Sequence, residues 1–260
     1  MVIVVASDQH LGYENSDKAS FNAFLDQLQA DASVTHLVLL GDVVDMWRRD
    51  ASGVFLENRD TFDRIAAIQK RIPVHYVYGN HDFHLRELKG HGYPFEFTDT
   101  LTLAESGRNY RFLHGFQFDE KQSPLLMEAL CRTMSDAAGI FESGIWATLP
   151  RIGPNLISQL VDWTDKDRAD AEALKQGPDV RLGDSLDAFE RKACASAKPG
   201  EILVFGHTHA PFINKAGTVV NTGSWLKGEA ITNTYVRLEA GGPRLFVFGG
   251  KEITDRKQCP

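Results

Sequence analysis

Cysteine is scarce in this sequence, with three residues among 260. Cys131, Cys194 and Cys259 are odd in number and widely spaced, which fits neither a disulfide framework nor a zinc site built from thiolates. We therefore expect all three to be reduced, structural thiols in a cytoplasmic protein.

Long hydrophobic runs and an excess of basic residues are also missing. The apolar start at residues 1–6 is much shorter than the apolar region of a signal peptide, and no run approaches the length of a membrane span. The 28 basic and 35 acidic residues give a net charge of −7, so no overall basic field attracts nucleic acid. We expect a soluble, unprocessed protein with no transmembrane segment. Nucleic acid stays open as a partner through a local basic groove, but the net charge does not favour it.

The sequence does contain the pattern of one layered α/β domain that spans residues 1–260. Hydrophobic residues make up 43% of the chain, which is enough for a substantial core. Continuous apolar runs at 2–6, 34–40 and 74–78 are typical of strands buried on both faces of a sheet. Between them, apolar residues at helical spacing predict helices at 18–30 and 54–72. This alternation indicates strands joined by crossover helices.

The second half of the chain predicts strands with short turns, interrupted by helices. We expect strands at 95–103, 109–113, 201–205, 212–220, 234–238 and 244–248, and a hairpin at Gly241-Gly242. Helical segments near 124–138, 154–174 and 182–197 break this pattern. We interpret 117–197 as a helical cap inserted into a single domain. Its apolar residues form either a helical core or an apolar groove for a lipid or nucleoside part of a substrate.

Five polar clusters fall where predicted strands end and loops begin. They are Asp8-Gln9-His10, Gly41-Asp42-Val43-Val44-Asp45, Gly79-Asn80-His81-Asp82, His114-Gly115 and Gly206-His207-Thr208-His209. Loops beyond the carboxyl ends of strands form the binding crevice of layered α/β sheets, so these clusters can form one site. Carboxylate, amide and imidazole ligands without a thiolate suit Mn²⁺, Fe or Zn²⁺, and their number is enough for two ions. Two such ions roughly 3.5 to 4 Å apart promote hydrolysis at phosphorus, because they clamp an in-line displacement and generate hydroxide at neutral pH.

With these five blocks, in this order, the chain resembles the calcineurin-like metallophosphoesterase superfamily, whose pattern is D-x-H, G-D-x-x-D, G-N-H-[DE], H and G-H-x-H. The resemblance covers residues 1–113 and 201–225. It implies an α-β-β-α sandwich of two mixed sheets and two divalent ions, Mn²⁺ before Fe or Zn²⁺, with attack on phosphorus by metal-bound hydroxide. It implies these roles: Asp8, His10 and His209 for the first ion, Asn80, His114 and His207 for the second, and Asp42 as the bridge.

The same resemblance assigns further roles around the metal ligands. His81 would be the general acid that protonates the leaving oxygen, with Asp82 orienting it, and an imidazole is suited to that task near neutral pH. Asp45 would hydrogen-bond ligands or backbone rather than a metal ion. Four further residues are candidates for binding substrate, with salt-bridged or solvated positions as the alternative for the arginines: Arg48, Arg49, His84 and Arg86.

Several functions remain open within this resemblance. The segment 41–47 and the helical insertion resemble the UDP-2,3-diacylglucosamine diphosphatases, which differ from this chain at His81 and Phe116. Residues 7–13 and 79–82 instead resemble the DNA-repair nucleases of the superfamily. A metal-binding scaffold without turnover is a third alternative, but the complete ligand set favours an enzyme. We therefore predict a phosphoester hydrolase that prefers a diester or pyrophosphate to a monoester, with an oligomeric state that the sequence does not indicate.

Overall fold

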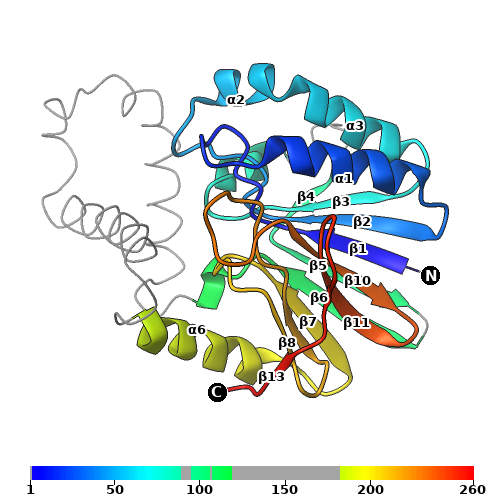
Figure 1. The fold of residues 1–260 in the computed structure, drawn as a ribbon, viewed down its shortest axis with the longest axis vertical. Coiled ribbons are helices and arrows are strands. Elements are labelled where there is room, and N and C mark those ends of the chain that lie inside the picture. Colours follow the sequence, from blue (N-terminus) through cyan, green and yellow to red (C-terminus); the bar gives the residue numbers. More distant parts are fainter. Residues whose placement is uncertain (1, 89–94, 106, 119–181) are drawn as a thin grey trace, which may run out of the picture.

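Two β-sheets pack face to face in the computed structural model of this chain, and helices cover their outer faces (Figure 1). The structure describes residues 2–88, 95–105, 107–118 and 182–260. Helices α1, α2 and α3 lie on the side of the first sheet, and α6 lies on the side of the second. The expected α-β-β-α sandwich of two mixed sheets is confirmed.

The first sheet contains the strands that open the chain. Four strands run parallel in the order β1 (Val2–Ala6), β2 (Val34–Leu40), β3 (Val74–Val77) and β4 (Phe97–Thr98). On the other side of β1 the sheet continues through three antiparallel strands, β10 (Thr234–Glu239), β11 (Gly242–Val247) and β12 (Glu252–Ile253). The turn between β10 and β11 lies at the expected hairpin, where Glu239 pairs with Gly242.

The second sheet comes from the middle and the end of the chain. Its order is β13-β8-β9-β7-β6-β5. The strands are β5 (Thr100–Glu105), β6 (Arg108–Leu113), β7 (Glu201–Phe205), β8 (Phe212–Asn214), β9 (Val219–Asn221) and β13 (Arg256–Lys257). Helix α6 (Leu182–Ser196) packs Phe189 and Ala193 against Phe205 and Phe212 of this sheet. Two short 3-10 helices, η1 (Phe83–Leu88) and η2 (Phe116–Phe118), follow β3 and β6.

The core is built by strands that bury both faces. In β1, Ile3 and Val5 face the second sheet, while Val4 and Ala6 face the helices. This is the period of two that a strand imposes on its side chains, and it explains why the strand sequence is continuously apolar. On the helical side, α1 (Lys18–Ala30) packs Phe24 against the core, and α1 has the predicted bounds. Among the described residues, no helix has both the length and the apolar character of a membrane span.

The helix expected at 54–72 is two helices. Helix α2 (Ala51–Glu57) begins earlier because the Asp50 side chain accepts a hydrogen bond of 2.9 Å from the Gly53 N–H and caps it. Helix α3 (Arg59–Gln69) follows after Asn58, whose side chain donates to the Val54 carbonyl oxygen at 2.7 Å. The apolar spacing is continuous across both helices, so it did not reveal the break.

Two strands expected from apolar runs are also divided. The run 95–103 separates at Asp99 into β4 and β5, which belong to different sheets. The run 212–220 is a hairpin in which the Gly217 N–H donates to the Asn214 carbonyl oxygen at 2.9 Å. Of the expected insertion at 117–197, the segments 124–138 and 154–174 lie outside the described residues. Its last helix is α6, close to the predicted 182–197.

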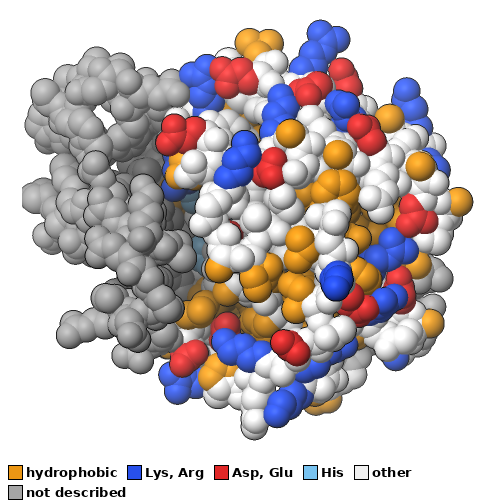
Figure 2. All heavy atoms as spheres, viewed as in Figure 1, with side chains coloured by type: hydrophobic (Ala, Val, Ile, Leu, Met, Phe, Trp, Pro, Cys, Tyr) orange, Lys and Arg blue, Asp and Glu red, His pale blue; other side chains and the backbone are white. Residues whose placement is uncertain are grey.

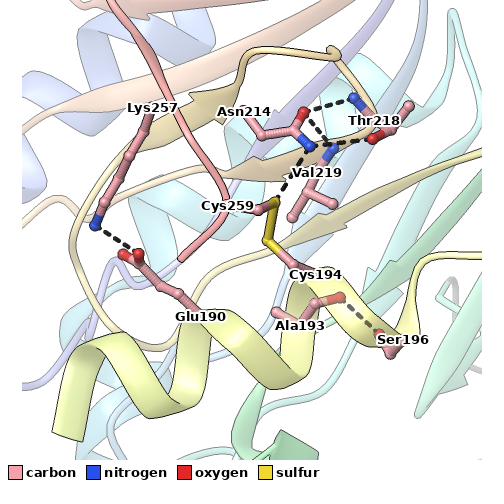
Figure 3. The surroundings of a disulfide bond; sticks show 9 residues. All are labelled: Glu190, Ala193, Cys194, Ser196, Asn214, Thr218, Val219, Lys257 and Cys259. Carbon is pink, nitrogen blue, oxygen red and sulfur yellow. Dashed lines mark hydrogen bonds and ion pairs between the residues drawn. A yellow bond between two sulfur atoms is a disulfide. The ribbon is translucent and has the colours of Figure 1, made fainter. Parts of the chain in front are cut away.

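A disulfide joins Cys194 of α6 to Cys259 of the tail, so the expectation of reduced thiols is wrong for this pair (Figure 3). The two Cα atoms are 6.1 Å apart although 65 positions separate them in the sequence. Strand β13 brings the tail alongside β8, and Lys257 Nζ lies 2.5 Å from Glu190 Oε2 on α6. The spacing of the cysteines in the sequence does not indicate that the tail returns to α6. Cys131 lies outside the described residues.

Loss of this disulfide is expected to destabilise the protein by about 2–4 kcal/mol, since the bond closes a long loop in the unfolded chain. We expect Cys194→Ser, Cys259→Ser and reduction of the wild type to lower the melting temperature by the same amount. Thermal unfolding with and without reductant measures this, and Cys131→Ser is the control that retains the response. A wild-type melting temperature that ignores reductant would contradict the prediction.

Candidate metal centre

The polar clusters meet at one end of the two sheets. Strands β1, β2 and β3 run parallel in the first sheet, and β6 and β7 run parallel in the second. The loops after these five strands carry the clusters at Asp8-His10, Asp42-Asp45, Asn80-Asp82, His114 and His207-His209. The first two loops are joined by backbone hydrogen bonds from Asp8 N to Gly41 O at 3.0 Å and from His10 N to Asp42 O at 2.8 Å. The structure thus brings together residues that are up to 201 positions apart, from 8 to 209.

The backbone at this site is held in an unusual conformation. Six non-glycine residues of the described part have positive φ, and all but Asn233 belong to the clusters: Asp8, His10, Asp42, His207 and His209. Such backbone costs about 1–3 kcal/mol per residue and persists only where the surrounding structure imposes it. The orientation of these side chains is therefore maintained at a cost in folding free energy.

Glycines give the side chains room. A Cβ at Gly79 would lie 2.7 Å from Asp42 N and 2.8 Å from His114 Cδ2. A Cβ at Gly206 would lie 2.9 Å from Ser7 Cβ. All three distances are too short for real atoms, so these glycines are required by the close packing of the polar residues around them.

The first group of possible metal ligands is Asp8, His10 and His209, whose ligand atoms lie within 4.8 Å of one another. Asp8 Oδ1 is 3.3 Å from His209 Nε2 and 3.9 Å from His10 Nε2. Asp8 also accepts hydrogen bonds from the hydroxyl of Ser7 and, at 3.1 Å, from the backbone N–H of His207.

The second group is Asp42, His114 and His207. Asp42 Oδ2 is 3.1 Å from His114 Nε2 and 3.8 Å from His10 Nε2, so this carboxylate lies within reach of both groups. Asn80 is 1% exposed, and its Oδ1 atom is buried without a hydrogen-bond partner among the described residues.

The residues present fit a pair of divalent cations. Asn80 Oδ1 is a buried atom without a hydrogen-bond partner in the described part of the chain, and buried His114 Nε2 faces the Asp42 carboxylate; both atoms are of the kind that coordinate metals. The Nδ1 atoms of the imidazoles are bound outward: His10 to Asp45 Oδ2 at 3.1 Å and His114 to the Leu40 carbonyl oxygen at 2.9 Å. Their Nε2 atoms are therefore the ones directed at the carboxylates.

Electrostatics favour cations at this position. Burial alone would raise the pKa of the Asp42 carboxyl, but neighbouring His114 and His81 lower it well below its usual range. Burial opposes protonation of His114, yet the carboxylates of Asp42 and Asp8 outweigh it and raise its pKa to about 9. Burial, followed by the charge of His114, lowers the pKa of His207 to about 3. The carboxylates remain ionised in a buried place, where only protonated imidazoles or metal ions can balance them.

His81 lies beside these two groups and is 5% exposed. Its Nδ1 is 3.1 Å from Asp45 Oδ1, and its backbone N–H donates to Asp42 Oδ1 at 2.9 Å. The Trp47 ring stacks on the imidazole with centroids 4.1 Å apart. Asp45 is fully buried. Because Asp45 Oδ2 contacts His10 Nδ1 and Asp45 Oδ1 contacts His81 Nδ1, this carboxylate links His10 of the first group to His81.

The carboxylate of Asp82 binds the loops beside the centre. It accepts hydrogen bonds from the Tyr76 hydroxyl at 2.7 Å, the Gly79 N–H at 2.5 Å and the Val43 N–H at 3.0 Å. These bonds tie the loop after β2 to the loop after β3. The carboxylate at the His81 ring is that of Asp45, so Asp82 supports the loops and Asp45 orients the imidazole.

The four candidates for substrate binding have different surroundings. Arg48 Nη1 lies 2.6 Å from Asp45 Oδ2, and its guanidinium is 4.4 Å from the centroid of the Tyr13 ring. Arg49 pairs with Glu57 and Asp50 on the α2 side.

The other two candidates belong to η1. Arg86 Nε lies 3.2 Å from Glu87 Oε1, and the Arg86 guanidinium lies over the Phe83 ring. His84 is half-buried in the same 3-10 helix. Arg48 contacts the centre through Asp45 and His81.

The sequence did not point to two residues of this centre. Glu229 Oε1 accepts from His209 Nδ1 at 2.7 Å, and Trp47 covers His81. Glu229 lies 20 positions after His209 in a loop without a motif, so no spacing rule could have found it. Trp47 follows Asp45 closely, but its apolar ring is as compatible with the core as with a site.

The chain is similar to several known proteins. Residues 1–211 match the family described as calcineurin-like phosphoesterase. Two relatives named UDP-2,3-diacylglucosamine hydrolase, from Shewanella sp. strains MR-7 and MR-4, are each 26% identical over 216 residues, which cover 80% of this chain and 81% of theirs. Yfce, a phosphoesterase from E. coli, is a solved structure with a TM-score of 0.48 and 18% identity, covering 98% of this chain and 97% of its own. Vps29 complexed with Zn²⁺ from Entamoeba histolytica has a TM-score of 0.44 and 14% identity, covering 97% and 98%.

Proposed function

Because the chain belongs to the calcineurin-like phosphoesterase family and is a phosphoester-hydrolysing enzyme, we propose that it acts with two divalent metal ions on a phosphodiester or a pyrophosphate. Asp8, His10 and His209 would hold one ion, Asn80, His114 and His207 the other, and Asp42 both. The observation that carries the proposal is the pair of ligand groups that share Asp42, beside the unpartnered oxygen of Asn80.

When bound, two such ions supply Lewis acidity on the phosphoryl oxygens and hydroxide as the nucleophile. The mixed oxygen and nitrogen donors favour Mn²⁺, with Fe or Zn²⁺ as alternatives. The protein's part is to hold the ligands before the ions arrive, since their loops are already fixed by backbone hydrogen bonds and by Asp82.

His81 would donate the proton in this reaction. As the bond from phosphorus to the leaving oxygen breaks, that oxygen would take the proton of His81 Nε2. Asp45 supports this role because it binds Nδ1 and leaves Nε2 as the donating atom. Arg48 lies beside the same ring, and its guanidinium can bind a phosphate oxygen of the substrate.

The named relatives and the surface charge bear on the substrate class. The relatives from Shewanella are named as hydrolases of UDP-2,3-diacylglucosamine, and a similar lipid-linked sugar nucleotide is one candidate. A DNA-repair type of nuclease is the alternative. Figure 2 shows acidic and basic side chains mixed over the visible described surface, and the net charge is −7, so the protein offers little attraction to a polyanion.

The disulfide bears on the cellular location. The cytoplasmic location expected from the sequence depended on three free thiols, and Cys194 and Cys259 form a disulfide. Since disulfides persist mainly in oxidising compartments, this bond supports such a compartment.

The test is to remove metal from the purified protein, restore Mn²⁺, and compare hydrolysis of bis(p-nitrophenyl) phosphate and p-nitrophenyl phosphate. We expect turnover that depends on Mn²⁺ and is faster with the diester. Faster turnover of the monoester would contradict the substrate class. Failure to bind metal would contradict the proposal as a whole, and two bound ions without activity on either compound would support a scaffold.

A further inference from the structure

His209 is more exposed than His10 and His114 at the same centre. Its side chain is 28% exposed, whereas those of His10 and His114 are 3% and 0% exposed. Its Nε2 faces Asp8 Oδ1 and His10 Nε2, each at 3.3 Å. An imidazole in this open position needs a partner on its other nitrogen to hold the ring in one orientation.

Glu229 is that partner, and it is itself held in place. Its Oε1 atom lies 2.7 Å from His209 Nδ1, while its Oε2 atom accepts from the hydroxyl of Ser224. Ser224 is fully buried, and the N–H of the next residue, Trp225, donates to the Asp8 carbonyl oxygen at 3.0 Å. The loop between β9 and β10 therefore contacts Asp8 by its backbone and His209 by the side chain of Glu229.

The two ligand groups differ in how their imidazoles are supported. In the first group, both imidazoles are bound at Nδ1 by carboxylates, Asp45 for His10 and Glu229 for His209. In the second group, the Nδ1 of His114 is bound by the neutral carbonyl of Leu40. A carboxylate behind an imidazole orients the ring and makes Nε2 a better ligand than a carbonyl does.

We propose that Glu229 is a positioning residue which fixes His209 toward Asp8 and thereby gives the first metal position its affinity. The inference rests on the proposed function, since it assigns an unequal affinity to the two ion positions of that same centre. Glu229 lies outside all five motif blocks, and within the described residues it reaches the metal position through His209.

The experiment is a calorimetric titration of the metal-free protein with Mn²⁺ in the wild type, Glu229→Ala and Glu229→Gln. We expect Glu229→Ala to lower the affinity of one binding step by about 10–100-fold and to leave the other step unchanged. Glu229→Gln retains an oxygen that accepts from Nδ1, so its loss is expected to be smaller than that of the alanine variant. Glu252→Ala is the matched control, because it removes a surface carboxylate that pairs with Arg244.

Steady-state kinetics distinguish a positioning role of Glu229 from general damage to the fold. We expect the kcat of Glu229→Ala to rise toward the wild-type value as the concentration of Mn²⁺ is raised, and thermal unfolding of the metal-free variant shows whether its fold is retained. Equal weakening of both steps, or no weakening of either, overturns the role of Glu229. A wild type that binds no Mn²⁺ instead overturns the proposed function, so the two failures are distinguishable.

Discussion

Asp42→Asn is expected to abolish metal-dependent hydrolysis and to weaken the binding of both metal ions. Asp42 Oδ2 lies between His114 Nε2 at 3.1 Å and His10 Nε2 at 3.8 Å, and thus between the two ligand groups. The amide keeps the size of the side chain but removes a charge that faces both cations in a buried place. We expect both dissociation constants for the metal ions to rise by about 100-fold or more. Substitution of residues that only hydrogen-bond the ligands typically lowers metal affinity by about 10–100-fold, and Asp42 would be a ligand itself. Turnover should fall by at least about 10³-fold, since the charge stabilisation lost is several kcal/mol.

Metal analysis and thermal unfolding check this expectation together. A bound ion stabilises the wild type by about 2.7 kcal/mol at 100 times its dissociation constant, so the rise in melting temperature on adding Mn²⁺ should be largely lost in Asp42→Asn. The melting temperature of the metal-free variant shows whether the fold is intact. Two ions bound with wild-type affinity would exclude Asp42 as the shared ligand.

His81→Ala is expected to keep both ions and to lose rate. Its backbone N–H, which donates to Asp42 Oδ1, is still present in alanine, so this link to the ligand groups survives. What disappears is the imidazole that Asp45 orients and Trp47 covers. The loss should be about 10²–10⁴-fold for a substrate with a poor leaving group and clearly smaller for a p-nitrophenyl ester, whose leaving oxygen needs little protonation.

The decisive measurement is the dependence of kcat on the leaving group, in the wild type and the variant, at saturating Mn²⁺. A steeper dependence in His81→Ala supports proton donation to the leaving oxygen. Equal losses for good and poor leaving groups would remove His81 from that role, and a loss of bound metal would assign it to the ligand set.

Local sequence patterns were enough to predict the strands that are buried on both faces and the helix that buries one stripe of residues. Residues 2–6, 34–40 and 18–30 have the predicted bounds because continuous apolar runs and helical spacing are properties of short segments. Patterns failed where neighbouring elements have the same periodicity. The division at Asp99 and the break at Asn58 interrupt no apolar pattern, since each depends on which layer the next segment packs against.

The candidate site also has a part that the sequence predicted and a part that it could not predict. The residue types and their positions at strand ends already indicated a metal centre, since the carboxyl ends of parallel strands meet and glycine, carboxylate and imidazole side chains cluster there. The partners of those residues could not be predicted. Asp45 rather than Asp82 contacts the His81 ring, and Glu229 contacts His209, because these contacts depend on side-chain directions in loops.

The sequence by itself therefore determined the strands at 2–6 and 34–40, the helix at 18–30 and the gathering of candidate ligands at strand ends, all of which depend on residue type and local period. Only the tertiary structure decided the return of the tail to α6, the disulfide of Cys194 with Cys259, and the carboxylates behind the imidazoles. The physical reason is distance along the chain. Contacts between residues 65 positions apart, or between loops of different strands, are set by how the layers pack, and no short segment carries that information.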